Sequence, residues 1–149
     1  GARVCIYQFL KPASMQTGES IMAERLAPQL RLVRLENDWS LTESLQDTKE
    51  IARMAKAIRE VLPSIIDDVS SGEWDMVILD EIVFCLSKGM ITESDLFEVM
   101  EARADNVELI LTGRGATQSL IDEADLVTEM VAVKHPYEQG ISARMGIEY

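Results

Sequence analysis

Three short polar stretches, each directly after an apolar run, hold most of the side chains that could do chemistry. They are Gln8 to Lys11, the acidic pair Asp80-Glu81, and Thr112 to Gly115. In open parallel sheets, ligands bind beyond the carboxyl ends of the strands. If the apolar runs are parallel strands, all three polar stretches line one edge of the sheet. The sequence therefore predicts one site built from distant parts of the chain.

The acidic pair follows four apolar residues, Met76 to Leu79, in the arrangement of a Walker B motif. Carboxylate oxygens suit Mg²⁺, a hard cation that also binds the oxygens of phosphate groups. Acidic residues at strand-to-helix junctions also occur simply as helix caps. The pair alone therefore leaves both a metal site and a structural cap open.

The stretch Thr112-Gly113-Arg114-Gly115 adds a second feature that could bind phosphate. Its glycines allow the backbone to approach a ligand closely, and the Arg114 guanidinium can donate two hydrogen bonds to phosphate oxygens. The alternative is a tight turn with a solvated arginine. Both interpretations stay open on these residues alone.

Other reactive or aromatic residues stand alone in the sequence. One histidine cannot build a metal site unaided, so we interpret His135 as a structural hydrogen-bonding residue. Trp39 lies in a polar loop, where it either packs onto its own domain or offers a flat apolar surface to a ligand. Cys5 and Cys85 lie within apolar segments and are interpreted as buried free thiols of a cytosolic protein.

The bulk composition limits the class of protein. With 149 residues and 47% hydrophobic side chains, one domain over residues 1–149 is expected. A net charge of −12, from 14 basic and 26 acidic residues, repels phosphate backbones and argues against nucleic acid as a partner. The sequence has no apolar run long enough to span a bilayer and no signal-peptide pattern. A cytoplasmic protein without a nucleic-acid or membrane partner is therefore expected.

Apolar runs predict the strands that position the three polar stretches. They cover residues 4–10, 30–35, 76–79 and 107–111, with a last strand near 126–133. Because these runs lack polar alternation, both faces of the sheet should be covered by helices. The predicted fold class is α/β, with a mainly parallel sheet and helices on both faces.

Three helical signals stand between these strands. Apolar residues at three- and four-residue steps predict an amphipathic helix over 48–69, which Pro63 should kink or divide. Thr92 to Asp95 resembles a helix N-terminal cap. A shorter helix is expected through Leu120 and Ile121, and the segment 36–46 is expected to be a loop.

Taken together, the motifs resemble a known family in order and approximate spacing, over essentially the whole chain. The N-terminal part contributes VCIYQFLK from Val4, Gly18-Glu19, Trp39 and VILDEI from Val77. The C-terminal third contributes LTGRG, ADLVTEM from Ala124 and the distinctive ending KHPYEQGISARMGIEY. These segments resemble the corrinoid adenosyltransferases of the BtuR/CobA type.

The resemblance implies a RecA-like P-loop fold and a homodimer. It also implies a reaction in which the cobalt of reduced cob(I)alamin, or of a related corrinoid, attacks the 5′-carbon of ATP and triphosphate leaves. Cobalt is then the nucleophile, so no catalytic serine, cysteine or histidine is required. Positioning and charge neutralisation suffice for such a displacement. A flavoprotein reductase is the partner that such chemistry suggests, in cobalamin biosynthesis or salvage.

Residue by residue, the resemblance assigns Glu81 to Mg²⁺, with Asp80 beside it, and Arg114 to the triphosphate. Lys11 is a further candidate for binding phosphate. Trp39 matches one of two aromatic residues that press on the lower face of the corrinoid. Asn37 stands where the family has the second, a phenylalanine, and an amide there would exclude water less well.

One family motif does not occur in this sequence. The family places a glycine-rich loop of the GxGKGKTT kind before the strand that begins here at Val4, and the 149 residues contain no G-x-x-x-x-G-K-[ST]. Such a loop supplies most phosphate contacts in P-loop proteins. We therefore expect that an N-terminal strand and the P-loop are missing and that this chain alone is inactive. The alternative is a non-catalytic corrinoid-binding or partner subunit that has lost ATP binding.

Overall fold

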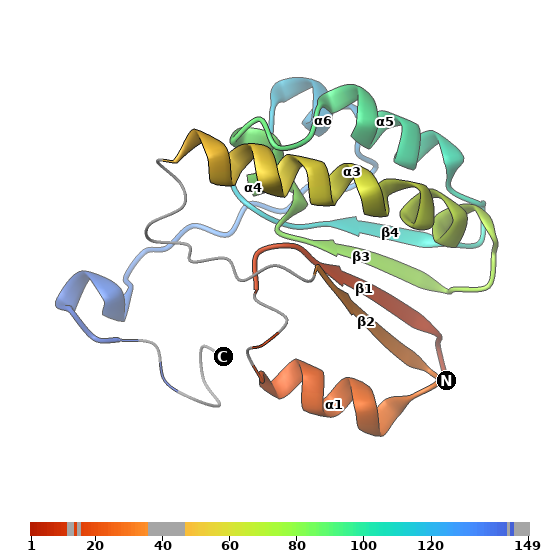
Figure 1. The fold of residues 1–149 in the computed structure, drawn as a ribbon, viewed down its shortest axis with the longest axis horizontal. Coiled ribbons are helices and arrows are strands. Elements are labelled where there is room, and N and C mark those ends of the chain that lie inside the picture. The colour runs from red at the N-terminus through yellow and green to blue at the C-terminus, as the bar shows by residue number, and fades with distance from the viewer. Residues whose placement is uncertain (12–13, 15, 36–46, 143, 145–149) are drawn as a thin grey trace.

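The central element is a four-stranded sheet in which every strand is parallel to its neighbours (Figure 1). The computed structural model describes residues 1–11, 14, 16–35, 47–142 and 144. The strands lie in the order β2-β1-β3-β4. Their bounds are β1 Val4–Gln8, β2 Leu30–Arg34, β3 Met76–Asp80 and β4 Glu108–Leu111. All four correspond to predicted strands, and the parallel α/β prediction is confirmed.

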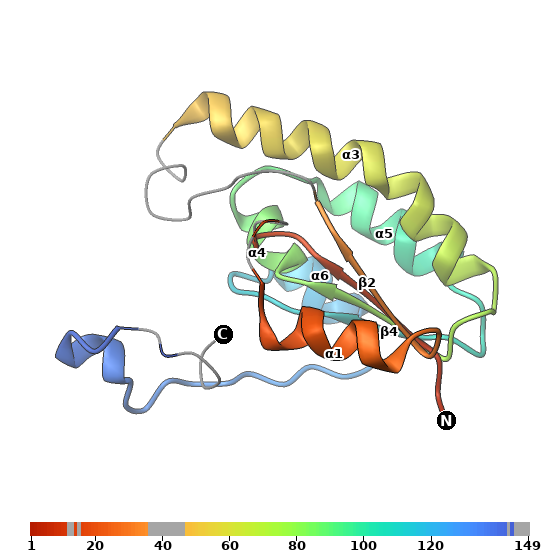
Figure 2. The ribbon, with the colours of Figure 1, turned by 60° about the horizontal axis from the view of Figure 1, so that its bottom comes forward.

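Helices lie on both faces of this sheet, as predicted. Figures 1 and 2 show α3 and α5 over one face and α1 on the other. The bounds are α1 Gly18–Leu26, α3 Thr48–Ser70, α4 Ile82–Ser87, α5 Glu93–Ala102 and α6 Gln118–Glu123, with a short 3-10 helix, η1, over Pro136–Gln139. None of the helices in the described ranges is long and apolar enough to cross a membrane.

The main core lies between the sheet and the α3–α5 layer. Cys5 and Tyr7 of β1 alternate with outward-facing residues, and Val77 and Leu79 do the same on β3; all four side chains are buried. The buried residues of α3 recur at helical spacing and include Met54, Ile58, Ile65 and Val69. Each such aliphatic side chain contributes roughly 1.5–3 kcal/mol relative to an exposed one. The amphipathic pattern of α3 thus fixes it to the sheet.

Pro63 does not divide α3, so that alternative of the prediction is wrong. The helix is continuous from residue 48 to residue 70 with Pro63 inside it. Proline removes the hydrogen bond to the carbonyl of residue 59, four positions earlier. Both Arg59 and Pro63 are exposed, so water can replace the lost bond, while buried Ile58 and Ile65 on either side hold the helix on the sheet.

Two of the shorter helices were predicted and two were not. Thr92 caps α5 in a capping box with Asp95, and α6 includes Leu120 and Ile121, so both predictions are confirmed. Neither α1 nor α4 was predicted. Ala23 is the buried residue of α1, and α4 has six residues, so neither shows a clear apolar period.

The prediction of a strand near residues 126–133 is wrong. This segment contains no strand, and Leu126, Met130 and Val133 are 84%, 93% and 92% exposed. Its apolar composition favours extended structure, but a strand also needs a partner for its backbone N–H and C=O groups. In the described sheet β4 is an edge strand, and the segment does not pair with it.

The α1 face of the sheet is less completely covered than the other. Leu32, Ile6, Ile78 and Ile110 are register partners and form one apolar row across all four strands. Helix α1 lies beneath the β2 and β1 side of this row (Figure 1), and Ile110 on β4 is 38% exposed. A hollow of about 390 Å³ between α1 and the sheet is lined by Ile6, Met22, Ala23, Leu30 and Leu32, among others.

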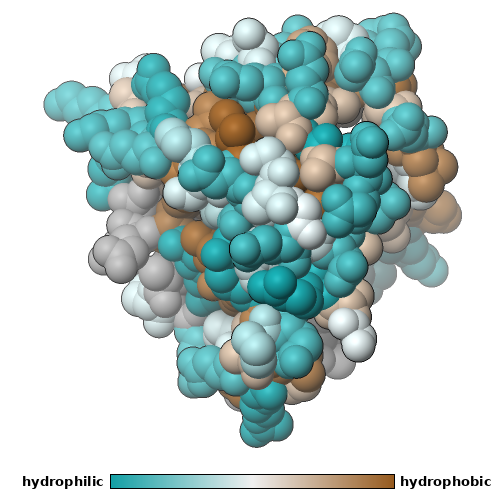
Figure 3. All heavy atoms as spheres, turned by 90° about the vertical axis from the view of Figure 1, so that its right-hand side faces the viewer, coloured by the Kyte–Doolittle hydropathy of each residue, from teal (hydrophilic) through white to brown (hydrophobic). Residues whose placement is uncertain are grey.

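A polar cluster joins the end of α3 to strands β1 and β2 and to Trp74. Asp68 accepts hydrogen bonds from the Tyr7 hydroxyl, the Arg31 guanidinium and the Trp74 indole, the last at 3.1 Å. The Arg31 and Arg3 guanidinium groups lie over the Trp74 ring, 4.7 and 4.9 Å from its centroid. The cluster lies toward the amino-terminal end of the strands, where the surface is largely hydrophilic (Figure 3).

The Asp68 cluster generates a stability prediction. Asp68→Asn removes the charge that three donors share and should lower the free energy of unfolding by about 2 kcal/mol, measured by urea denaturation. Asp67→Asn, a change at the exposed neighbouring position, is the matched control and should have little effect. Equal stability of the two variants would contradict a stabilising role for the cluster.

Candidate ligand site at the carboxyl end of the sheet

The parallel register brings the three predicted polar stretches to one edge. Gln8, the last residue of β1, pairs with Arg34 of β2 and Asp80 of β3. The Phe9 amide donates to the Asp80 carbonyl at 3.3 Å, and the Thr112 amide donates to the Leu79 carbonyl at 3.1 Å. The segments that follow β1, β3 and β4 are thus adjacent, as the sequence predicts.

Glu81 occupies a strained turn between β3 and α4. Its φ is 67°, the one positive value at a non-glycine residue in the described part of the chain, and its amide donates to Thr112 Oγ1 at 2.9 Å. Glu81 is the N-cap residue of α4, but its side chain makes no capping hydrogen bond. The carboxylate therefore does not serve as an ordinary helix cap. A left-handed non-glycine residue costs on the order of 1–3 kcal/mol and is typical of functional sites.

Asp80 is held from two sides. Its Oδ2 accepts from Gln8 Nε2 at 3.3 Å, and its Oδ1 accepts from Thr112 Oγ1 at 3.0 Å. Burial, and then the Asp80 carboxylate, raise the pKa of Glu81, whereas the cationic Arg114 and Lys11 act in the opposite direction. The site therefore combines two adjacent carboxylates with two cationic side chains from other segments.

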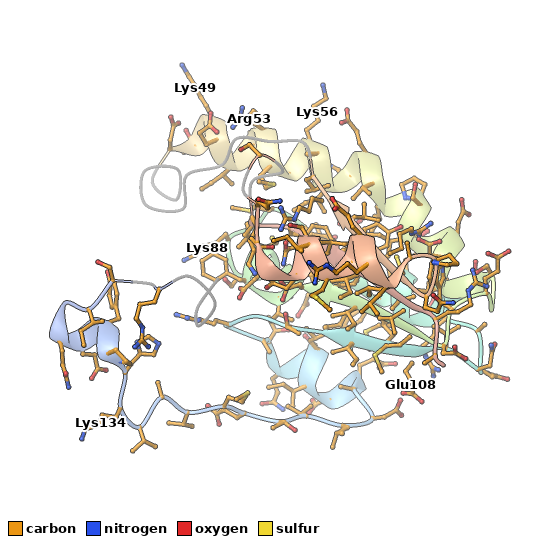
Figure 4. All side chains as sticks on the ribbon, turned by 90° about the horizontal axis from the view of Figure 1, so that it is seen from below. Lys49, Arg53, Lys56, Lys88, Glu108 and Lys134 are labelled. Carbon is orange, nitrogen blue, oxygen red and sulfur yellow. The ribbon has the colours of Figure 1, made fainter. Side chains whose placement is uncertain are left out.

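Lys11 already has an anionic partner. Its Nζ lies 2.7 Å from Glu19 Oε1, in the first turn of α1, and this hydrogen bond lowers the pKa of Glu19 to about 2. For Lys11 to bind phosphate it would have to exchange this partner for the ligand. Lys88, labelled in Figure 4, lies at the end of α4 with its Nζ 5.2 Å from the Phe84 ring centroid.

Glycine is required in the 112–115 turn by the helix behind it. Gly113 has φ 136°, and a Cβ there would lie 2.6 Å from the Phe84 backbone nitrogen in α4. Gly115 has φ 81°, and its Cβ would meet that of Ser87 at 3.0 Å. The sequence left open whether these glycines admit a ligand or form a tight turn; in the structure they allow the turn to pack on α4.

The remaining predicted residues fall into two groups. Trp39 and Asn37, together with the predicted loop 36–46, lie outside the described residues. His135 precedes η1, and its Nδ1 accepts a hydrogen bond from the Tyr137 amide at 3.1 Å, which agrees with a structural role. Two residues that bond to the site from neighbouring elements, Arg34 and Thr17, were not predicted, because nothing in their local sequence marks them.

The carboxylates of Asp80 and Glu81 are of the kind that binds Mg²⁺ together with a phosphate ligand. Within the described ranges no group of three or more His, Cys, Asp or Glu side chains could hold a metal ion. Mg²⁺ is usually held by one or two carboxylates, water and substrate phosphates rather than by a cage of protein ligands. Asp80 and Glu81 would supply such a partial set if Mg²⁺ bound here, and Arg114 would be the nearby cation for its phosphates.

The fold defines a parallel α/β protein with a candidate ligand site at the carboxyl ends of its strands. The chain belongs to the family of ATP:corrinoid adenosyltransferases BtuR/CobO/CobP, whose family model matches residues 1–149. This confirms the resemblance seen in the sequence motifs and, with it, a fold of the P-loop type.

Individual relatives agree with the family. A corrinoid adenosyltransferase of Pseudomonas aeruginosa is 31% identical over 149 residues, which is 100% of this chain and 70% of the relative. One from Sinorhizobium is 32% identical over 150 residues, covering 100% and 68%. The corrinoid adenosyltransferase of Escherichia coli K12 is 26% identical, and 72% of it is covered.

The packing of the glycine turn generates a second prediction. Gly113→Ala should lower the free energy of unfolding by about 2 kcal/mol more than Gly89→Ala, because its methyl group meets the α4 backbone. Gly89 is the control for backbone conformation alone: its φ is 69°, and a Cβ there has nothing within 4 Å. Similar losses in chemical denaturation would show that the contact with α4 does not constrain the turn.

Proposed function

We propose that the protein transfers the 5′-deoxyadenosyl group of ATP to the cobalt of a reduced corrinoid and releases triphosphate. The observation that carries the proposal is the family match over all 149 residues, which includes the three polar stretches that meet at one edge. Relatives named corrinoid adenosyltransferase, two of them above 30% identity, support it. The same resemblance supports a homodimer and a flavoprotein reductase that reduces the cobalt of the corrinoid substrate.

The residues of the edge have distinct tasks under this proposal. Glu81, with Asp80 beside it, would hold Mg²⁺, which neutralises phosphate charge when bound. Arg114 would donate to the triphosphate, and Lys11 would leave Glu19 to do the same. The nucleophile is the cobalt of the substrate, so the protein supplies position and charge rather than a reacting side chain. Trp39 and Asn37 would contact the corrinoid.

We further propose that the active protein includes a phosphate-binding loop that these 149 residues do not contain. The sequence has no G-x-x-x-x-G-K-[ST], and the Pseudomonas relative has 30% of its length outside the match. The edge of β4, with Ile110 partly exposed, and the exposed apolar segment 126–133 are where a further strand would find partners. A loop after that strand would open at the same edge as Asp80 and Glu81.

A test of the site uses the protein that carries such a loop. Glu81→Gln removes the charge that holds Mg²⁺ at nearly constant size, and turnover should fall on the order of 100-fold with the fold unchanged. Glu98→Gln, on the exposed side of α5, is the control. Corrinoid adenosylation followed by its absorbance change, with circular dichroism for the fold, measures both. Activity within about twofold of the parent would assign Glu81 a structural role only.

A second test uses the 149-residue chain itself. It should bind MgATP more weakly than the micromolar range by calorimetry, because it lacks loop amides and the loop lysine and carries a charge of −12. Micromolar binding would require another phosphate site, with Lys11 the first residue to replace. Corrinoid binding without adenosylation by any longer form would favour the non-catalytic subunit.

A further inference from the structure

Gln8 is a buried polar residue at the end of an apolar strand. It is 4% exposed, and it follows Tyr7, which is 2% exposed. A buried amide is costly unless both its N–H₂ and its C=O find partners. The hydrogen-bond partners of the Gln8 side chain therefore indicate its structural role.

Both ends of the Gln8 amide are used, and by residues of different strands. Nε2 donates to Asp80 Oδ2 at 3.3 Å, and Oε1 accepts from Arg34 Nε at 3.0 Å. Arg34 Nη2 donates in turn to Thr17 Oγ1 at 2.5 Å. Thr17 is 2% exposed and caps the N-terminus of α1. One side of Asp80 is thus tied through Gln8 and Arg34 to the start of α1.

The other side of Asp80 is tied to Glu81 through Thr112. The Thr112 hydroxyl has one proton, which it donates to Asp80 Oδ1 at 3.0 Å, and its oxygen accepts the Glu81 amide at 2.9 Å. This bond holds the backbone of Glu81 in its left-handed conformation. A methyl group in place of the hydroxyl would leave that amide without this acceptor.

The bonds form one continuous row, which we name the carboxyl-end relay: Arg34, Gln8, Asp80, Thr112 and Glu81. Its first three members are register partners across β2, β1 and β3, and Thr112 directly follows β4. Donor and acceptor roles are fixed along it, because arginine only donates and an ionised carboxylate only accepts. The relay is therefore a directed network and not a set of interchangeable contacts.

We propose that Gln8 and Arg34 are positioning residues that hold the Asp80-Glu81 pair, through the relay, in the arrangement that receives a divalent cation with its phosphates. Gln8 orients the Asp80 carboxylate, Arg34 orients Gln8, and Asp80 orients the Thr112 hydroxyl that fixes Glu81. The role toward the cation rests on the proposed function, whereas the hold on Glu81 does not. Neither residue needs to touch a ligand for this role.

The hold on Glu81 is tested by hydrogen exchange in the 149-residue chain. Gln8→Met removes both amide bonds at similar size and should speed exchange of the Glu81 amide about fivefold, while the Val77 and Leu79 amides within β3 stay unchanged. NMR detects each amide separately. Thr112→Val should speed exchange at Glu81 at least as much, and Thr112→Ser, which keeps the hydroxyl, should restore the parent rate. If the exchange rate of the Glu81 amide is unchanged in Gln8→Met, the proposed relay is wrong.

A second variant covers the case in which Gln8→Met fails to fold. Arg34→Met acts at the half-buried end of the relay and should speed exchange of the Glu81 amide in the same direction. Arg25→Met, at an exposed position of α1, is its control and should not. Faster exchange throughout β3 in Arg34→Met, without a selective effect at Glu81, would show that the row only joins strands, and it would overturn the proposal.

The role toward the cation is tested in the complete adenosyltransferase. Gln8→Met should raise the Mg²⁺ concentration for half-maximal activity about tenfold, with kcat largely recovered at saturating Mg²⁺. A fall in kcat without a change in the Mg²⁺ requirement overturns this part. If the selective exchange at Glu81 is found but the parent adenosylates no corrinoid, the proposed function fails and the hold on Glu81 stands. The two failures are therefore distinguishable.

Discussion

Parallel pairing of β1 with both β2 and β3 is the constraint on which the site depends. Because Gln8 is the register partner of Arg34 and Asp80, these strands end at one level and their last side chains meet. The residues that meet there are far apart in the sequence, so no single local segment could build the site. The apolar face of α3 stabilises that register by burying one side of β1 and β3.

Unusual backbone conformations are concentrated in the turns between the strands and the helices that follow them. Glu81 takes a left-handed conformation, and Gly113 a conformation that glycine alone readily adopts, with backbone contacts too close for a side chain. The two turns support each other, since Val83 donates to the Thr112 carbonyl at 3.0 Å and Glu81 to the Thr112 hydroxyl. These contacts fix the backbone of the acidic pair relative to the 112–115 turn; under the proposed function, that is the preorganisation that charge-stabilising sites need.

The parts of the structure with strong local signals could be predicted from the sequence. The four apolar strands, the amphipathic α3 and the Thr92 cap were of this kind, and the three polar stretches followed from the parallel arrangement. The row through Arg34 and Thr17 could not be predicted, because it depends on the register between strands. The segment 126–133 was misread because apolar composition does not supply a pairing partner. The assignments of Trp39 and Asn37 remain predictions.

The apolar row of the sheet that ends at the partly exposed Ile110 has a consequence for the chain in solution. An edge strand with free backbone groups and exposed isoleucine is a template onto which other chains can add. The charge of −12 opposes such contact by mutual repulsion between molecules. Salt screens that repulsion over distances of roughly 10 Å at 0.1 M, but it leaves apolar attraction intact. The net charge of the chain thus opposes self-association, most strongly in dilute buffer and less as ionic strength rises.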